Sequence, residues 1–121
     1  MNVENAKSQM RKGMLEYCVM LLLSHQASYA NDIIEQLKVA RMLVVEGTLY
    51  PLLTRLKKEG LLSYEWQEST QGPPRKYYNL TDEGHAFLAE MDGAWSELVH
   101  TVSILKGNLL PSPEDIQKRN M

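Results

Sequence analysis

The 121-residue chain contains one cysteine, Cys18, so no disulfide can form within it. Its apolar runs are short, and the longest, residues 18–23, cannot span a bilayer. The charged N-terminus is not followed by the apolar region and small-residue cleavage site of a signal peptide. We therefore expect one domain with a modest core, a buried Cys18 thiol, a reduced cytoplasmic compartment and no membrane contact.

Sequence motifs of catalysis and metal binding are missing as well. The chain has no phosphate-binding glycine loop and no GxSxG, HExxH or CxxC pattern. His25, His85 and His100 are scattered and lack cysteine or carboxylate partners at ligand spacing. We predict a protein that is not an enzyme and needs no metal or cofactor. A small enzyme with its site at a dimer axis is the alternative.

An overall positive charge is also absent, since the formal net charge is -2. The charge is unevenly distributed: residues 1–80 hold 10 Lys/Arg against 8 Asp/Glu, whereas residues 81–121 hold 3 against 7. A positive field on one part of a protein can steer it to phosphates. The composition therefore does not exclude a nucleic-acid partner.

Residues 46–60 carry the clearest pattern. An apolar stripe with helical spacing is formed by Leu49, Leu52, Leu53 and Leu56. Because proline is tolerated near a helix start, Pro51 places that start near Gly47 or Thr48, and Gly60 supplies the end. The opposite face is small, polar and basic, with Thr54 and Arg55 near its centre. It is either a solvated face or one that enters a DNA major groove.

Residues 61–68 alternate with the period of a half-buried strand, which places Leu62, Tyr64 and Trp66 on one side. Residues 69–74 break the chain, and residues 75–80 predict the returning strand. Tyr78 lies on the same side as Leu80, so we assign it to packing. A helix followed by a hairpin with a basic pair near its tip describes a winged helix.

The segments EGTLYPLLTRLKKEGLL and GPPRKYYNLTDEG resemble the PadR family of transcriptional regulators. The resemblance covers about residues 8–106. It implies a winged helix-turn-helix fold whose third helix and wing form the DNA surface. The short remainder is similar to the short PadR subfamily, which carries a single C-terminal helix. Some of its members sense drugs or other aromatic compounds between subunits and then release DNA.

The segments before residue 46 are predicted less sharply. Residues 1–8 should be frayed or partly helical, and residues 24–28 should be a connector. Residues 10–23 predict a helix that buries Met14, Leu15, Cys18, Leu21 and Leu22. A second helix should bury Ala30, Ile33, Ile34 and Leu37, with Ser28 or Asn31 as its cap. The apolar residues 39–45 are either a short strand of the wing sheet or a packed loop.

After the wing, Thr81 should cap a helix that runs to about Lys106 and ends at Gly107. Its apolar residues alternate in steps of three and four, as in a heptad seam: Leu88, Met91, Trp95, Leu98, Val102 and Leu105. One wing domain has little core to offer so long a helix, so we expect a second subunit and hence a homodimer.

The expected fold is mainly α with a small β-hairpin (α+β). A winged helix DNA-binding domain should occupy residues 8–80, and a C-terminal dimerisation helix should occupy residues 81–107. Residues 108–121 should form a flexible tail, although residues 112–115 could start one more helical turn.

The predicted site has two parts. Phosphates would be met by Lys7, Arg11, Lys57, Lys58, Arg75 and Lys76, although lysines near the first helix start are equally compatible with solvation. Base edges would be met by Thr48, Tyr50, Thr54 and Arg55. In the dimer helix, Trp95 with Met91 and Leu98 either lines a slot for a planar aromatic ligand or only anchors the dimer.

We therefore predict a homodimeric repressor that binds a pseudo-palindromic double-stranded DNA operator and is released by a small aromatic effector. The alternative is a winged-helix module that binds a protein and has only incidental DNA affinity.

Overall fold

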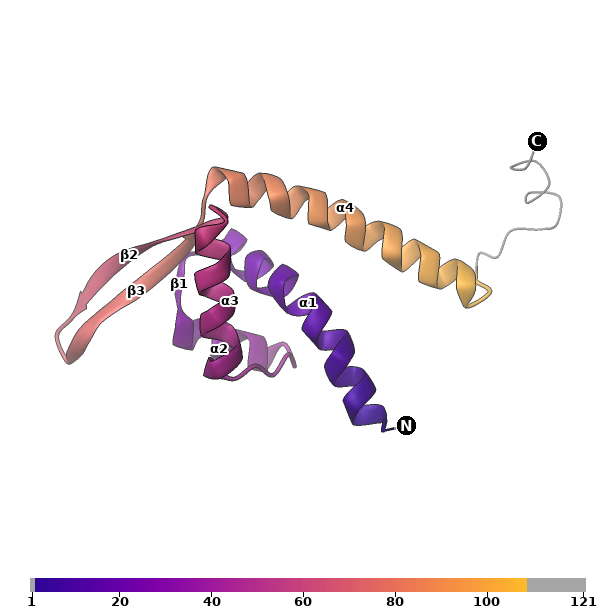
Figure 1. The fold of residues 1–121 in the computed structure, drawn as a ribbon, viewed down its shortest axis with the longest axis horizontal. Coiled ribbons are helices and arrows are strands. Elements are labelled where there is room, and N and C mark those ends of the chain that lie inside the picture. Colours follow the sequence, from indigo (N-terminus) through magenta and orange to yellow (C-terminus); the bar gives the residue numbers. More distant parts are fainter. Residues whose placement is uncertain (1, 109–121) are drawn as a thin grey trace. The chain divides into compact units, whose positions relative to one another are not determined.

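The computed structural model describes residues 2–108 of the chain. Along the chain its elements are α1 (Val3–His25), β1 (Ser28–Tyr29), α2 (Ala30–Val39), α3 (Glu46–Lys58), β2 (Leu62–Ser69), β3 (Gly72–Leu80) and α4 (Asp82–Leu105) (Figure 1). These elements form the expected α+β winged-helix fold. The chain divides into two compact units, Met1–Leu88 and a second that begins at Ala89. Residues 109–121 of the predicted tail lie outside the described residues.

The first helix starts earlier than predicted. The side chain of Asn2 caps α1, because its Oδ1 accepts a hydrogen bond from the Glu4 N–H at 2.8 Å. Of the two alternatives for residues 1–8, fraying is therefore wrong from Val3 onward and the partly helical one is confirmed. The buried side chains of α1 are Leu15, Tyr17, Val19, Met20 and Leu23. The other predicted core positions, Met14, Cys18, Leu21 and Leu22, are only half-buried. Both β3 and α2 pack against α1, which widens the buried side beyond a single stripe. Burial raises the pKa of the Cys18 thiol.

The connector predicted before α2 contains a strand. Ser28 and Tyr29 form β1, which pairs antiparallel with Tyr78 and Tyr77 of β3. The sheet order is β1-β3-β2. Neither Ser28 nor Asn31 caps α2, since its N-cap is Tyr29 and no side chain there accepts a capping hydrogen bond.

The apolar run that follows α2 is a loop. Val39 ends α2, and Arg41 turns the chain with a φ of 67°. Of the two alternatives the strand is therefore wrong, and the loop is not packed as expected because Leu43 and Val45 are exposed.

The leucine stripe of α3 is buried as predicted at Leu49, Leu52, Leu53 and Leu56. The helix begins at Glu46, slightly before the expected start, so Pro51 lies beyond its first turn. Gly60 ends the helix with a φ of 80°. The N–H groups of Gly60 and Leu61 donate to the carbonyls of Lys57 and Leu56, both at 3.0 Å. These bonds form a Schellman motif, so the predicted stop is confirmed.

The hairpin is longer than predicted, because β3 starts at Gly72 and only Thr70 and Gln71 separate the strands. Its register pairs Tyr64 with Tyr78 on the face that carries Leu62 and Leu80. The two tyrosine rings stack with centroids 5.7 Å apart, and Tyr78 is buried, which confirms its assignment to packing.

Thr81 joins the start of α4 to the end of α3. Its Oγ1 accepts a hydrogen bond from the Gly84 N–H at 3.0 Å, as expected of an N-cap. The same hydroxyl donates to the Gly60 carbonyl at 2.6 Å, and the Thr81 N–H donates to the Leu61 carbonyl at 3.1 Å. Gly84 lies against that carbonyl so closely that an added Cβ would overlap it.

Leu88 is a correction to the predicted dimer seam. Its side chain is only 6% exposed within this chain, so it belongs to the core of the first unit and has no free surface for a partner subunit. The helix ends at Leu105, and Gly107 follows with a φ of 94°, close to the predicted stop. Among the described residues, no helix combines the length and hydropathy that crossing a bilayer requires.

Gly84→Ala should lower the free energy of unfolding by about 1 to 3 kcal/mol, because the new methyl group overlaps the Leu61 backbone, which cannot rotate away. Gly93→Ala is the matched control in the same helix, since a Cβ there meets no atom within 4 Å. Alanine should be neutral or stabilising at that position, by up to about 1 kcal/mol. Urea unfolding followed by circular dichroism compares the two. Equal effects would contradict the close approach.

Candidate nucleic-acid interface

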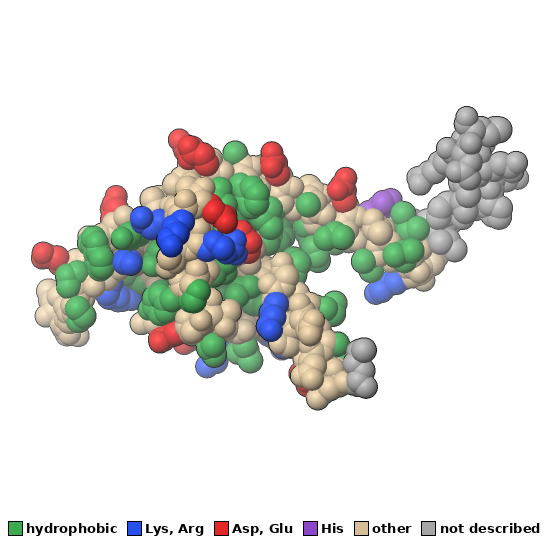
Figure 2. All heavy atoms as spheres, viewed as in Figure 1, with side chains coloured by type: hydrophobic (Ala, Val, Ile, Leu, Met, Phe, Trp, Pro, Cys, Tyr) green, Lys and Arg blue, Asp and Glu red, His purple; other side chains and the backbone are tan. Residues whose placement is uncertain are grey.

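The exposed face of α3 carries two rows of side chains. Tyr50, Thr54 and Lys57 follow one another at i, i+4 and i+7, so they form one row along the helix. Arg55 and Lys58 belong to the neighbouring row. Lys and Arg side chains gather over the C-terminal end of α3 and the adjoining hairpin, with acidic groups beside them (Figure 2). The structure thus exposes every predicted base-contacting residue, including Thr48 near the helix start.

Two shallow hollows meet on this face. The first, of about 540 Å³, lies between α3 and the hairpin, where Tyr50 and Thr54 oppose Trp66 and Lys76. The second, of about 510 Å³, continues on the outer side of α3. It is lined by Tyr50, Pro51, Thr54, Arg55 and Lys58. Tyr50 and Thr54 line both hollows, which we call together the α3 groove.

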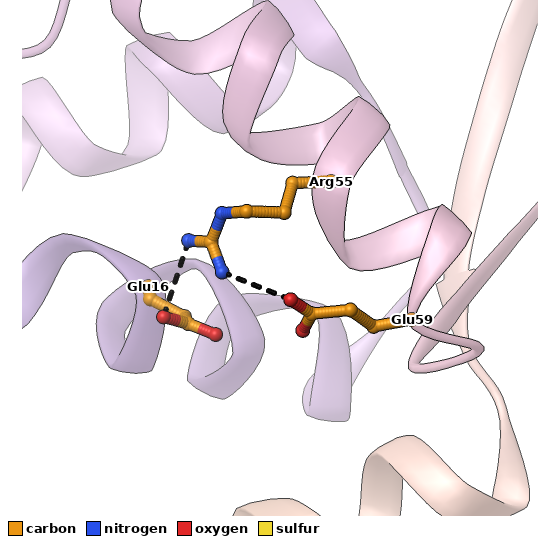
Figure 3. Close-up of polar contacts among 3 residues, drawn as sticks. All are labelled: Glu16, Arg55 and Glu59. Atoms are coloured by element: carbon orange, nitrogen blue, oxygen red, sulfur yellow. Dashed lines mark hydrogen bonds and ion pairs between the residues drawn. The ribbon is translucent and has the colours of Figure 1, made fainter.

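Arg55 is held by two carboxylates. Its Nη2 lies 3.3 Å from Glu16 Oε2 on α1, and its Nη1 lies 3.4 Å from Glu59 Oε1 at the end of α3 (Figure 3). The hydrogen bond and charge of Glu16, helped by Glu59, raise the pKa of Arg55, so it stays a cation. Both ends of the guanidinium are occupied within the protein. A guanidinium carries five N–H donors and the Arg55 side chain is 50% exposed, so its predicted contact with a base edge stays a prediction.

Lys76 and Arg75 lie on opposite faces of the hairpin, as neighbours on a strand must. The Lys76 Nζ lies 4.6 Å from the Tyr64 ring centroid and 5.4 Å from that of Trp66. Lys57 reaches the same Tyr64 ring from α3, with its Nζ 5.1 Å from the centroid. The strand alternation could have predicted the Lys76 neighbours, but the approach of Lys57 depends on how α3 packs against β2.

The Arg75 side chain lies over the ring of Tyr29 in β1. Its guanidinium carbon is 3.8 Å from the ring centroid. Tyr29 is itself fixed, because its hydroxyl hydrogen-bonds Gln67 Oε1 at 3.2 Å and its ring packs on Tyr77 at 4.8 Å. Sequence analysis missed Tyr29, because its role arises from the pairing of β1 with β3.

Tyr78 closes the inner wall of the α3 groove. Burial raises the pKa of Tyr78, and the neighbouring Tyr50 and Tyr64 hydroxyls raise it further because ionised phenols would repel one another. Tyr78 is therefore a neutral hydrogen-bonding group at neutral pH. The structure thus brings Tyr50 of α3 close to the hairpin core.

The two predicted phosphate contacts on α1 are placed separately from the α3 groove. Lys7 pairs with Glu4 at 3.6 Å in an exposed i, i+3 pair, and Arg11 is half-buried. Such an exposed pair contributes little to stability. Neither residue lines the two hollows of the α3 groove. Their predicted role in phosphate binding remains a prediction.

The second unit carries an exposed apolar row on α4. Within the predicted seam Met91 is half-buried, whereas Trp95 is 42% and Leu98 is 56% exposed. Val102 and Leu105 continue the exposed row. In the described part of the chain, no three or more His, Cys, Asp or Glu side chains gather to form a metal site.

Comparison with known proteins agrees with this geometry. The model of the transcriptional regulator PadR-like family matches residues 19–90. A PadR-like transcription factor from Bacteroides fragilis is 67% identical, with a TM-score of 0.72, over 84% of this chain and 98% of the other. A PadR family regulator from Eggerthella lenta is 36% identical, with a TM-score of 0.76, over 85% and 90% of the two chains.

A curated relative, the transcriptional regulator Rv3488 of Mycobacterium tuberculosis, is 44% identical over 49% of this chain and 54% of its own length. The matched family model covers more than half of the chain and includes α3, the hairpin and the first turns of α4. The chain belongs to the PadR-like family of transcriptional regulators.

Proposed function

We propose that the protein is a homodimeric repressor that binds double-stranded DNA through the α3 groove and the hairpin. The observation that carries this proposal is the division of α3 into two faces. Its leucine face is buried in the first unit, whereas Tyr50 and Thr54 face an open groove that Lys76 also lines. Lys57 lies over the same Tyr64 ring as Lys76. A helix fixed on one side, with hydroxyl groups on the other, suits insertion into a major groove.

Within this proposal Tyr50 and Thr54 contact base edges at the centre of the groove, and Thr48 contacts them near the start of α3. Hydroxyl groups can donate to or accept from base edges, and the threonine methyl can touch a thymine methyl. Phosphates are contacted by Lys7, Arg11, Lys57, Lys58, Arg75 and Lys76. We assign Arg55 to the positioning of α3 on α1, because it forms ion pairs with Glu16 and Glu59.

The exposed row on α4 supports a homodimer. Met91, Trp95, Leu98, Val102 and Leu105 keep the spacing of a coiled-coil seam without Leu88. A second copy of the same row would cover these side chains, and the twofold axis would pair two α3 helices. The operator is then pseudo-palindromic, with half-sites about one helical turn, or a multiple of it, apart.

We infer that an aromatic effector binds at the same seam. Trp95 is bulkier than its neighbours in the row, so two copies that meet across an axis leave a slot into which a flat molecule can stack. Such a ligand releases DNA only if it binds more tightly to a dimer whose two α3 helices are wrongly spaced for the operator.

The experiment that tests the proposal most directly is selection of duplexes from a random pool by the purified protein, followed by addition of candidate aromatics. We expect a two-fold symmetric motif to be enriched. Binding of duplexes with no motif enriched would contradict operator recognition. It would favour a protein-binding module with incidental DNA affinity. Turnover of an added compound would favour an enzyme instead.

Thr54→Val should narrow the difference in binding free energy between the selected operator and random DNA by about 0.5 to 1.5 kcal/mol, the net value of one hydrogen bond. Valine keeps the shape of the side chain and removes only its hydroxyl. Lys58→Gln is the control on the same helix, and it should weaken both duplexes alike and lower the salt dependence. Fluorescence anisotropy at several salt concentrations measures both. An unchanged preference in Thr54→Val would remove Thr54 from the reading surface.

Arg55→Gln should weaken binding to operator and random duplexes by similar factors, because it releases Glu16 and Glu59 as uncompensated carboxylates beside the DNA. The double variant Arg55→Gln/Glu16→Gln should recover part of that loss. Anisotropy titrations with all single base-pair variants of the operator provide the measurement. Loss of preference at one base pair, without recovery in the double variant, would instead restore Arg55 as a base reader.

A flat aromatic effector should quench the indole emission of the protein through contact with Trp95. The quenching should vanish in Trp95→Leu and persist in Trp66→Phe, because Trp66 lies in the hairpin of the other unit. Sedimentation of each variant at micromolar concentration controls for loss of the dimer. Emission that does not change over the full soluble range of the tested compounds would count against the slot.

A further inference from the structure

Two lysines from different elements share one aromatic ring. Lys57 extends from the last turn of α3 and Lys76 from β3, and both Nζ atoms lie over Tyr64, at 5.1 and 4.6 Å from its centroid. The distance between the two Nζ atoms therefore cannot exceed the sum of 5.1 and 4.6 Å. The Trp66 ring packs edge-on against Tyr64, with centroids 5.7 Å apart, and extends the platform under Lys76.

No carboxylate balances this pair of charges. Within residues 2–108, the ion pairs of the structure involve Lys7 and Arg55, and neither Lys57 nor Lys76 has an acidic partner within ion-pair distance. Trp66 is paired with Lys76 across the hairpin, so Glu65, the next residue on β2, lies on the opposite face. Lys76 is also half-buried, which makes an uncompensated charge less favourable there than on an open surface.

We propose that Lys57 and Lys76, held by Tyr64 and Trp66, form a single anion site that grips one phosphate of the DNA backbone. We call this group the lysine clamp. The proposal deepens the function proposed above and rests on it, because it assumes that the anion is a phosphodiester of a bound duplex. It differs from a row of independent phosphate contacts in one respect: two cations from two elements converge on the same phosphate.

The position of the lysine clamp supports a backbone phosphate as its occupant. Lys76 and Trp66 form one wall of the α3 groove, directly across from Tyr50 and Thr54. A DNA strand whose bases contact Tyr50 and Thr54 must pass its sugar-phosphate backbone along a wall of the α3 groove. The negative charge of that backbone then meets both ammonium groups where the protein supplies no carboxylate.

The aromatic platform has a function of its own in this arrangement. A lysine on a free surface loses side-chain entropy when it contacts a phosphate. The Tyr64 ring attracts both ammonium groups before DNA arrives and keeps them beside it. Tyr64 is therefore a positioning residue that carries no charge but affects electrostatic binding.

Salt dependence of DNA affinity tests whether the two lysines share a phosphate. The slope of log K against log salt falls by about 0.9 for each phosphate contact that is lost. If both lysines grip one phosphate, the double variant Lys57→Gln/Lys76→Gln should lose about 0.9 in total. Two independent contacts would lose about twice as much, about 1.8, and that result would overturn the clamp. Lys106→Gln, in the other unit, is the charge control and should leave the slope unchanged.

Tyr64→Leu tests the platform. It should lower the slope and the affinity although it removes no charge, whereas Tyr64→Phe should retain both because the ring remains. Thermal unfolding of the two variants identifies a loss of fold, and a Tyr64→Leu protein that is folded and binds like the wild type would overturn the positioning role.

Trp66 emission separates the possible anions. A duplex should change the emission, because the phosphate draws the Lys76 ammonium off the ring, and the change should be absent from Trp66→Phe and Lys76→Gln. A response to inorganic phosphate but not to a duplex would overturn the backbone assignment. No response to either would overturn the clamp as a whole. A response to every duplex without sequence preference would overturn operator recognition and leave the clamp standing.

Discussion

The burial of four leucines on one side of α3 is the constraint on which the rest of the structure depends. Because Leu49, Leu53 and Leu56 are completely inaccessible, the helix cannot rotate about its axis without exposing them. That fixed rotation decides that Tyr50 and Thr54 face the groove and that Arg55 faces α1. The orientation of Tyr50 and Thr54, which we propose to contact base edges, therefore follows from hydrophobic packing.

Charges around this helix are arranged in two different ways. Arg55 has two carboxylate partners and links α3 to α1, whereas Lys57 and Lys76 have aromatic neighbours and no acidic partner among the described residues. The first arrangement neutralises a cation within the protein, and the second leaves cations available to an external anion. A formal net charge of -2 is compatible with DNA binding for this reason, since the position of unpaired cations matters more than their total.

The features that the sequence predicted correctly are local ones. The leucine stripe, the stop at Gly60 and the Thr81 cap each depend on residues within a few positions of one another. Contacts between distant segments were missed. Arg55 and Glu16 are 39 positions apart, β1 is too short to show a period, and the burial of Leu88 depends on the packing of the first unit. Residue types and spacing predict which side chains bind DNA, but they do not predict the partners of those side chains within the protein.

Thr81 has a consequence for how mutations in α4 are interpreted. Its hydroxyl is shared by the carbonyl of Gly60, which ends α3, and the N–H of Gly84, which begins α4. A substitution in the first turn of α4 that breaks these hydrogen bonds therefore also disturbs the end of α3. In a genetic screen for loss of the repression proposed above, variants at these positions would be recovered although Thr81 and Gly84 do not line the α3 groove.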